Sequence, residues 1–435
     1  MVTSANRIVL TSLMLFSMFF GAGNLIFPPL LGQSAGDATS LAMIGFIASA
    51  VGLPILGVAA IAKTGGFEQL AGRVHPLFAI LFPLAVYLAI GPLLAIPRAG
   101  SLAYEMGVAP FLPEGWNGAL PLFIYTLLFF GFAYFLALDP DKLAKRFGAI
   151  LTPALLLLIG AIITRSFFVD FGETGSATGA YAASPIAQGF QDGYLTMDAL
   201  ASLAFGIVVL FALKNQGAPK ERLVKETIYA GAIAGSVLLA VYLVLGYLGA
   251  KSTGLFAPAE NGAGTLTNLM LHFFGQPGGI LLGLLFTLAC LTTSVGLITS
   301  CAQYFAKQFP RVSYRSWMTI LTVSSLFTSN LGLSKILQVS VPVLTFVYPA
   351  AIVLILLGLV DDYLRMKRLA YAGAISFALA VGLFDALQAM QVLDSPLSFM
   401  PFAEQGFAWA TPAVLFILIG MTGRKEEVQV QEETA

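Results

Sequence analysis

The most informative stretch of this chain is Phe19-Phe20-Gly21-Ala22-Gly23-Asn24-Leu25-Ile26-Phe27-Pro28-Pro29. It lies in the middle of the first long apolar segment, which runs from about residue 8 to residue 31. Two glycines and an asparagine within four residues disfavour a continuous helix, because each glycine costs about 1 kcal/mol relative to alanine. If the segment crosses a bilayer, the backbone groups freed by a break must find other partners. We therefore expect a broken helix that lines a neighbouring helix, water or a bound solute.

The composition is that of a membrane protein. Of the 435 residues, 58% are hydrophobic and only 10% are charged, and the mean hydropathy is +0.88. The net charge is zero, which gives no reason to expect a nucleic-acid partner. A helix of about 20 apolar residues is long enough to cross a bilayer. An all-α polytopic membrane protein with 12 transmembrane helices is predicted, the spans lying at about residues 8–31, 40–62, 76–104, 119–137, 147–165, 190–213, 227–249, 277–303, 316–332, 336–360, 370–392 and 406–423.

The basic residues predict the orientation of these spans, because cytoplasmic loops of membrane proteins are enriched in lysine and arginine. If the N-terminus is cytoplasmic, all but four of the 22 basic residues fall in cytoplasmic segments. The four exceptions are Arg98, Arg165, Lys251 and Lys335. An even number of spans then places both termini in the cytoplasm. We expect residues 166–189 to form an extracellular loop and residues 424–435 a cytoplasmic tail.

The sixth span carries a second unusual stretch, Asp198-Ala199-Leu200-Ala201-Ser202-Leu203-Ala204-Phe205-Gly206, in which small and polar residues lie at membrane depth. Span 1 runs outward and span 6 runs inward. Matching interruptions in two halves of opposite orientation predict an inverted-repeat transporter whose site lies at the breaks. We expect residues 1–165 and residues 190–360 to form the two five-helix repeats, and residues 361–423 to add helices 11 and 12.

The broken stretch of span 1 has two interpretations. Unwinding exposes the backbone N–H groups of residues 21–23, and these donors, with the helix dipole, favour an anion such as a carboxylate. The carbonyl groups near Ser17 and Phe20, at the end of the preceding half-helix, suit a cation, and the amide oxygen of Asn24 suits a cation or a substrate. The alternative is that small residues simply allow close helix packing.

The sixth span places a carboxylate inside the membrane. On insertion scales this costs about 2.5–3.5 kcal/mol, so the side chain of Asp198 is expected to face a cavity or a partner. It either couples transport to an ion or a proton, or forms a structural ion pair with Arg98 in the outer part of span 3. One turn later, Ser202 offers a hydroxyl group and Phe205 an apolar wall.

The eighth span contains three hydroxyl side chains in succession, in Ala289-Cys290-Leu291-Thr292-Thr293-Ser294. Oxygen atoms are the ligands that hard alkali and alkaline-earth cations prefer. Thr292 and Thr293 are therefore candidate cation ligands, with the carbonyl group of Ala289 nearby. The alternative is that these hydroxyl groups donate to carbonyl groups of their own helix and only bend it.

These motifs resemble those of a known family. Residues 20–29, together with Met197-Asp198-Ala199-Leu200-Ala201-Ser202-Leu203-Ala204-Phe205-Gly206, are similar to the branched-chain amino acid:cation symporter family, the bacterial system II carriers often called BrnQ. The resemblance covers nearly the whole chain. More distantly, the chain resembles sodium-coupled amino acid transporters of the LeuT type, although residues 21–24 precede the Phe27-Pro28 pair by one residue fewer than in those proteins.

This resemblance implies a LeuT-like fold of two inverted five-helix repeats. It also implies the positions of a substrate site and a sodium site. In that fold, broken spans 1 and 6 bind the substrate, and spans 1 and 8 share a sodium ion. The implied sodium ligands are the carbonyl groups of Ser17, Phe20 and Ala289 and the hydroxyl groups of Thr292 and Thr293. The implied substrate-binding residues are Gly21, Ala22, Gly23, Asn24, Ala201, Ser202, Phe205 and, from span 3, Tyr87.

The resulting hypothesis is a cation-coupled importer of L-leucine, L-isoleucine and L-valine in the bacterial cytoplasmic membrane. Na⁺ is the expected coupling ion, and proton coupling through Asp198 is the alternative. Neither a bound cofactor nor an obligate protein partner is expected. An enzyme is not expected, because the sequence contains no HExxH motif, no serine–histidine pair in a motif context and no cysteine cluster. A channel would more typically show rings of charge or repeated filter loops.

Overall fold

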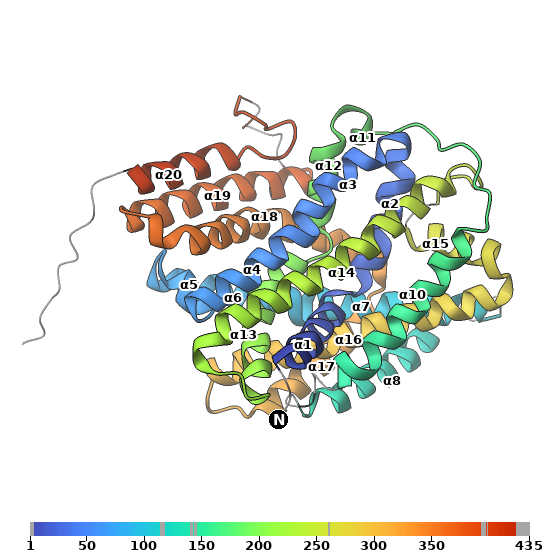
Figure 1. Cartoon of the computed structure of the whole chain (residues 1–435), viewed down its shortest axis with the longest axis horizontal. Coiled ribbons are helices and arrows are strands. Elements are labelled where there is room, and N and C mark those ends of the chain that lie inside the picture. The colour runs from blue at the N-terminus through green and yellow to red at the C-terminus, as the bar shows by residue number, and fades with distance from the viewer. Residues whose placement is uncertain are drawn as a thin grey trace, which may run out of the picture.

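The computed structural model describes residues 4–113, 118–139, 142, 146–259, 262–392, 397 and 399–422. Within these ranges all regular secondary structure is helical (Figure 1). The α-helices are α1 (Ser4–Phe19), α2 (Ala22–Ala35), α3 (Thr39–Ile47), α4 (Leu53–Thr64), α5 (Phe67–Gly72), α6 (Pro76–Leu88), α7 (Ala95–Gly107), α8 (Ala119–Ala137), α10 (Thr152–Ser166), α11 (Ala180–Ala183), α12 (Pro185–Tyr194), α13 (Asp198–Asn215), α14 (Leu223–Ser252), α15 (Gly262–Phe274), α16 (Gln276–Gln308), α17 (Tyr314–Ser329), α18 (Leu333–Val360), α19 (Lys367–Ala389) and α20 (Ala410–Thr422). Short π-helical turns lie at Ala48–Gly52, Ala89–Leu93 and Phe147–Leu151, and short 3-10 turns at Gly36–Ala38, Ala109–Phe111, Lys220–Arg222 and Asp361–Tyr363.

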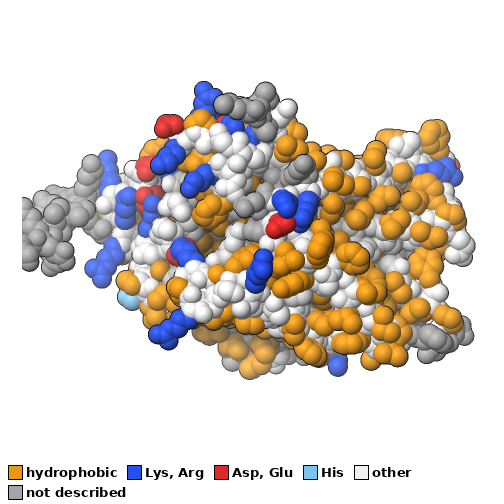
Figure 2. Space-filling view, turned by 90° about the horizontal axis from the view of Figure 1, so that it is seen from below, with side chains coloured by type: hydrophobic (Ala, Val, Ile, Leu, Met, Phe, Trp, Pro, Cys, Tyr) orange, Lys and Arg blue, Asp and Glu red, His pale blue; other side chains and the backbone are white. Residues whose placement is uncertain are grey.

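The surface of the molecule is suited to a bilayer. Among the described residues, nine helical stretches are long and apolar enough to cross a membrane, and α1 and α20 are apolar but shorter. Large apolar side chains point outward on several of them: Leu157 of α10 is 75% exposed and Phe132 of α8 is 64% exposed. Figure 2 shows hydrophobic side chains over much of one end of the molecule, whereas most of the visible lysine and arginine side chains gather elsewhere. The chain is therefore a multi-pass membrane protein.

The first expected span is interrupted at the quoted stretch. Helix α1 ends at Phe19 and α2 begins at Ala22. Between them, Gly21 has an extended backbone, with φ −127° and ψ −152°. The backbone N–H of Gly21 donates to the side-chain oxygen of Asn24 at 3.1 Å, so Asn24 satisfies a donor that a helix start leaves free. Asn24, three residues after Gly21, thus fixes the start of the second half-helix.

The sixth expected span is also interrupted, but not where the sequence suggested. Helix α12 ends at Tyr194 and α13 begins at Asp198. The break lies at residues 195–197, where Met197 adopts a left-handed backbone conformation with φ +67°. The expected position, residues 198–206, is instead continuous helix. Small side chains there do not interrupt the helix, because its backbone hydrogen bonds remain intact and the small residues serve close packing.

The two broken segments lie at the centre of the molecule. Helix α1 packs against α13, α14 and α16, and α7 packs against α16. Helices α18, α19 and α20 pack against one another at one side, at the left of Figure 1, and α18 joins them to the rest of the molecule by packing against α4. The start of α1 is held by a buried ion pair in which Arg7 donates to the two carboxylate oxygens of Glu226 at 2.8 and 2.7 Å. This pair fixes α1 to the beginning of α14.

Candidate functional site

A small cavity lies where the two broken segments meet. It receives backbone and side chains from both breaks and from α7 and α16. Its volume is about 20 Å³, which is close to the space that one water molecule requires. The conformation is therefore closed around the site. The lining residues are Met18, Phe19, Gly21, Ala22, Gly23, Asn24, Ile90, Ala95, Arg98, Ala99, Thr196, Met197, Asp198, Ala201, Thr293 and Leu297.

The glycines of the first break allow other groups to approach its backbone. A Cβ atom on Gly21 would lie 2.6 Å from the hydroxyl oxygen of Thr293. A Cβ atom on Gly23 would lie 2.9 Å from Nη2 of Arg98 and 3.0 Å from the Cα atom of Thr196. Real Cβ atoms do not tolerate such contacts without displacement of their neighbours. The absence of side chains at these two positions thus lets span 1 touch α7, α16 and the break in span 6.

A buried hydrogen-bond network joins the two breaks. The side-chain amide of Asn24 donates to Oδ2 of Asp198 at 2.5 Å and also to the hydroxyl oxygen of Tyr242. The hydroxyl group of Tyr242 in turn donates to Asp198 at 3.0 Å. All three side chains are buried. Tyr242 was not anticipated from the sequence, although a tyrosine in an apolar helix is a signal, since a buried tyrosine hydroxyl normally has a hydrogen-bond partner.

Arg98 closes the other side of the cavity. Its Nη1 donates to the carbonyl oxygen of Leu195 at 2.8 Å and its Nη2 donates to that of Thr196 at 3.5 Å. These carbonyl groups belong to the break in span 6, where the helix cannot satisfy them. The ion pair with Asp198, one of the two alternatives for that carboxylate, is not formed as a direct salt bridge: the salt bridges of the described residues do not include it. Instead, Arg98 is held by main-chain carbonyls and Asp198 by Asn24 and Tyr242.

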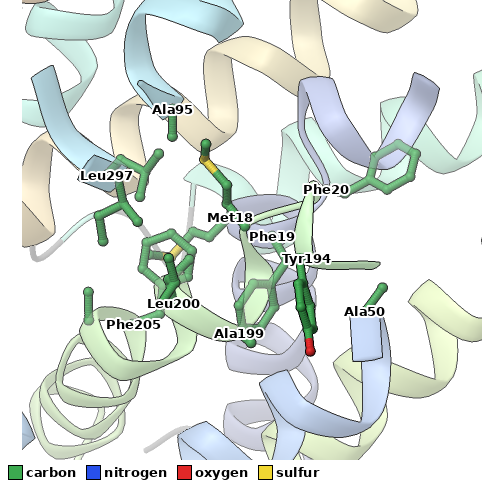
Figure 3. Close-up of a cluster of buried hydrophobic side chains, with 14 of the residues drawn as sticks. Met18, Phe19, Phe20, Ala50, Ala95, Tyr194, Ala199, Leu200, Phe205 and Leu297 are labelled. Carbon is green, nitrogen blue, oxygen red and sulfur yellow. The ribbon is translucent and has the colours of Figure 1, made fainter. Parts of the chain in front are cut away.

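The remaining wall of the cavity is apolar. Met18 and Phe19 of α1, Ala95 of α7 and Leu297 of α16 gather beside the break (Figure 3). Phe205 supports this wall from behind, with its ring centroid 5.4 Å from that of Phe19.

Three of the expected substrate-binding residues do not line the cavity, whereas Ala201 does. Phe205 lies behind Phe19. The hydroxyl group of Ser202 donates to the carbonyl oxygen of Ala199 at 2.6 Å, so it is engaged within its own helix. Tyr87 stacks on Tyr304 with ring centroids 4.0 Å apart, and both line a different cavity. Which face each of these residues presents depends on helix packing, and the sequence motif alone did not determine it.

The expected cation ligands converge in part. The hydroxyl group of Thr293 lies 3.4 Å from the carbonyl oxygen of Ser17. Helix α16 therefore approaches the end of α1. Phe20 directly follows the last residue of α1 and lies at the break. The hydroxyl group of Thr292 donates to the carbonyl oxygens of Leu288 and Ala289, at 3.1 and 3.0 Å. In this conformation Thr292 thus makes the local helix contact that was the alternative to cation binding.

Two solved transporters share this architecture. A structure of Mhp1, a nucleobase-cation-symport-1 family transporter, in a closed conformation with bromovinylhydantoin bound, matches with a TM-score of 0.61 at 15% identity, over 95% of this chain and 91% of that one. A crystal structure of MhsT in complex with L-phenylalanine matches with a TM-score of 0.57 at 17% identity, over 88% of this chain and 97% of that one. The chain therefore has the LeuT-like fold.

Sequence comparison is more specific. Residues 4–427 match the family described as "Branched-chain amino acid transport protein". The branched-chain amino acid permease BraB of Bacillus subtilis is 43% identical over 422 residues, covering 95% of this chain and 94% of that protein. The permease BrnQ of Escherichia coli is 38% identical over 419 residues, with 95% and 94% covered. These relatives are transporters and not enzymes. With a match across nearly its whole length, this chain belongs to the branched-chain amino acid transport protein family.

Proposed function

We propose that this protein imports L-leucine, L-isoleucine and L-valine across the cytoplasmic membrane by symport with a cation, and that the cation is Na⁺. The observation that carries the proposal is the meeting of two helix breaks, one from each half of the chain, at a single buried cavity. Such breaks place backbone donors and acceptors outside the helical hydrogen-bond pattern at membrane depth, which is where transporters of this kind bind their substrates.

The cavity has the chemistry that an apolar amino acid requires. The charged head of the substrate would lie against residues 21–24, where the backbone N–H groups at the start of α2 can bind a carboxylate, and against Ala201 of α13. The branched side chain would lie against Met18 and its apolar neighbours. Phe205 would support the apolar wall through Phe19, whereas Ser202 and Tyr87 would contact the substrate only in a conformation that brings them to the cavity. Discrimination among the three substrates would be modest, because one methylene contributes only about 1–3 kcal/mol.

The sodium ion would bind on the other side of the break in span 1. Its ligands would be the carbonyl oxygens of Ser17, Phe20 and Ala289, with the hydroxyl groups of Thr292 and Thr293. The 3.4 Å contact between Thr293 and Ser17 supports this placement, because it shows that α16 reaches the end of α1. The C-terminal end of a helix also favours a cation through its dipole.

Transport would proceed by alternating access. The cavity of about 20 Å³ is too small for leucine, so binding requires the elements around it to separate. We propose 12 membrane helices, ten of them in two inverted repeats, with both termini in the cytoplasm. Binding of substrate and cation together would change the relative stabilities of outward-open and inward-open conformations.

A proton is the alternative coupling ion, and one observation favours it. Asp198 is buried at the cavity and accepts hydrogen bonds from Asn24 and Tyr242, with no salt bridge to a basic residue in the described part of the chain. A carboxyl group in such a place is a suitable carrier of one proton.

Uptake into proteoliposomes tests the proposal and separates the two ions. Radiolabelled leucine uptake would be measured with an inward Na⁺ gradient at equal pH on both sides, and then with an inward proton gradient and K⁺ in place of Na⁺. We expect accumulation only with the Na⁺ gradient, competition by isoleucine and valine, and none by lysine. Accumulation with the proton gradient alone would establish the alternative, and no leucine uptake under either gradient would refute the proposed function.

A further inference from the structure

We propose that Arg98 is the receptor for the carboxylate group of the transported amino acid, acting together with the first backbone N–H groups of α2. The inference rests on the proposed function and adds to it the residue that recognises the acid group. It also gives a reason why the carrier would select amino acids over amines with the same side chain.

The first observation is that Arg98 makes no salt bridge with an acidic side chain of the described residues, although Asp198 is near enough to interact with it electrostatically. The side chain is 3% exposed, and a buried charge without compensation is strongly disfavoured. Its hydrogen bonds go to two main-chain carbonyl oxygens, those of Leu195 and Thr196. Its Nε–H group is buried without a hydrogen-bond partner among the described residues. An arginine side chain can donate five hydrogen bonds, so donor capacity remains for a ligand.

The second observation is the position of this guanidinium group. Arg98 lines the cavity at the helix breaks, and Nη2 lies 2.9 Å from the point that a Cβ atom on Gly23 would occupy. The guanidinium group is therefore beside the first turn of α2, a helix of 14 residues. The first N–H groups of a helix have no partner within the helix, and its dipole is positive there. Arginine and helix start together form a site for an anion.

Asp198, an acidic residue that lines the same cavity, does not occupy this anion site. Its carboxylate is engaged by Asn24 and Tyr242, and no salt bridge of the described residues joins it to Arg98. One face of the guanidinium group is covered by the ring of Phe27, 5.9 Å from its centroid. The substrate's carboxylate would supply the missing negative charge, in the planar two-point contact that arginine favours.

Analogues of leucine that lack one charged group test this role. Leucinol keeps the ammonium group and the branched side chain but has an alcohol in place of the carboxylate, and 4-methylpentanoate keeps the carboxylate but lacks the ammonium group. Dissociation constants for leucine and both analogues would be measured with purified protein by competition with radiolabelled leucine. The variant is Arg98→Gln. Arg165→Gln is the matched control, because Arg165 also donates to a main-chain carbonyl, that of Phe273, but lies outside the cavity.

We expect Arg98→Gln to weaken leucine binding by roughly 10- to 100-fold, the effect of losing a hydrogen-bonded contact to a charged group. Binding of 4-methylpentanoate should weaken by a similar factor, whereas leucinol binding should not change. The preference for leucine over leucinol therefore falls only in the Arg98 variant. If leucine and leucinol binding weaken together, Arg98 only holds α7 to the break in span 6, and the proposal is wrong.

A second variant keeps the proposal testable if Arg98→Gln does not fold. Arg98→Lys retains the positive charge but loses the planar donor pair, so its preference for leucine over leucinol should lie below that of the wild type. An unchanged preference would overturn the proposal. Failure of the proposed function is a separate result, because it would appear as absence of leucine binding to the wild-type protein.

Discussion

Replacing Gly23 with alanine should slow leucine transport by preventing the closed conformation. The added Cβ atom would lie 2.9 Å from Nη2 of Arg98, 3.0 Å from Cα of Thr196 and 3.2 Å from the carbonyl oxygen of Leu195. The arginine tip can move, but the other two contacts are with backbone. The methyl group would therefore push the break in span 6 away from the break in span 1.

The magnitude follows from two opposing effects. Adding a methyl group to a well-packed core costs about 1–3 kcal/mol, and replacing glycine in a helix regains up to about 1 kcal/mol. The net effect on the closed conformation is a loss of about 1–2 kcal/mol. Since 1.4 kcal/mol is a tenfold change in an equilibrium constant, the equilibrium constant for closing should fall roughly 5- to 30-fold.

The assay is the initial rate of Na⁺-driven leucine uptake into proteoliposomes, with thermal unfolding measured in parallel. Gly131→Ala is the matched control: it makes the same chemical change inside α8, where an added Cβ atom would meet nothing within 4 Å. We expect the control to transport like the wild type and to be as stable or slightly more stable, because alanine is the better helix former.

The expected result is a large loss of uptake in Gly23→Ala with little change in unfolding temperature. Normal uptake in Gly23→Ala would refute the inference that the two breaks must touch during the transport cycle. A loss of uptake equal to that of Gly131→Ala would show that the effect does not depend on the closed site.

Three further changes test separate parts of the structure. Thr293→Ala should raise the Na⁺ concentration for half-maximal uptake about tenfold through loss of one ligand; an unchanged Na⁺ dependence would remove Thr293 from the cation site. Asp198→Asn should retain Na⁺-driven uptake, because the amide oxygen can still accept hydrogen bonds, and loss of all ion-driven uptake would favour proton coupling. Glu226→Gln should destabilise the protein by about 1–3 kcal/mol, the effect of weakening a hydrogen-bonded contact between charged groups; this is measured by thermal unfolding, and an unchanged midpoint would show that the pair contributes nothing.

The break in span 1 could be predicted from sequence because its cause is local. The backbone N–H group of Gly21, which the break leaves outside the helix, donates to the side chain of Asn24 only three residues later. No residue from a distant part of the sequence is needed for this contact. The break in span 6 has a distant cause. Its carbonyl groups are satisfied by Arg98, about a hundred residues earlier in the chain, and the left-handed residue is a methionine, which gives no signal in the sequence.

The residues expected at the substrate site line the cavity where the break fixes their positions, and lie away from it where the rotation of a helix decides. Asn24, Ala201 and Thr293 lie at the cavity. Ser202 belongs to the same helix as Ala201 but points away from it, since adjacent residues in a helix do not face the same side. Asp198 and Arg98 do not form a direct salt bridge, because Asp198 accepts hydrogen bonds from Asn24 and Tyr242, whereas Arg98 donates to main-chain carbonyl groups. The spacing of residues in the sequence does not show which of several possible partners a side chain contacts.

The position of bound L-leucine in an experimental structure of the protein in Na⁺ would locate the transport site. We expect leucine between residues 21–24 and Asp198, with its side chain toward Met18 and its carboxylate toward Arg98. A second cavity is larger, about 420 Å³, and is lined by Asp192, Asp385 and Glu404. Leucine bound there, with the breaks still in contact, would contradict the central claim that the helix breaks form the transport site.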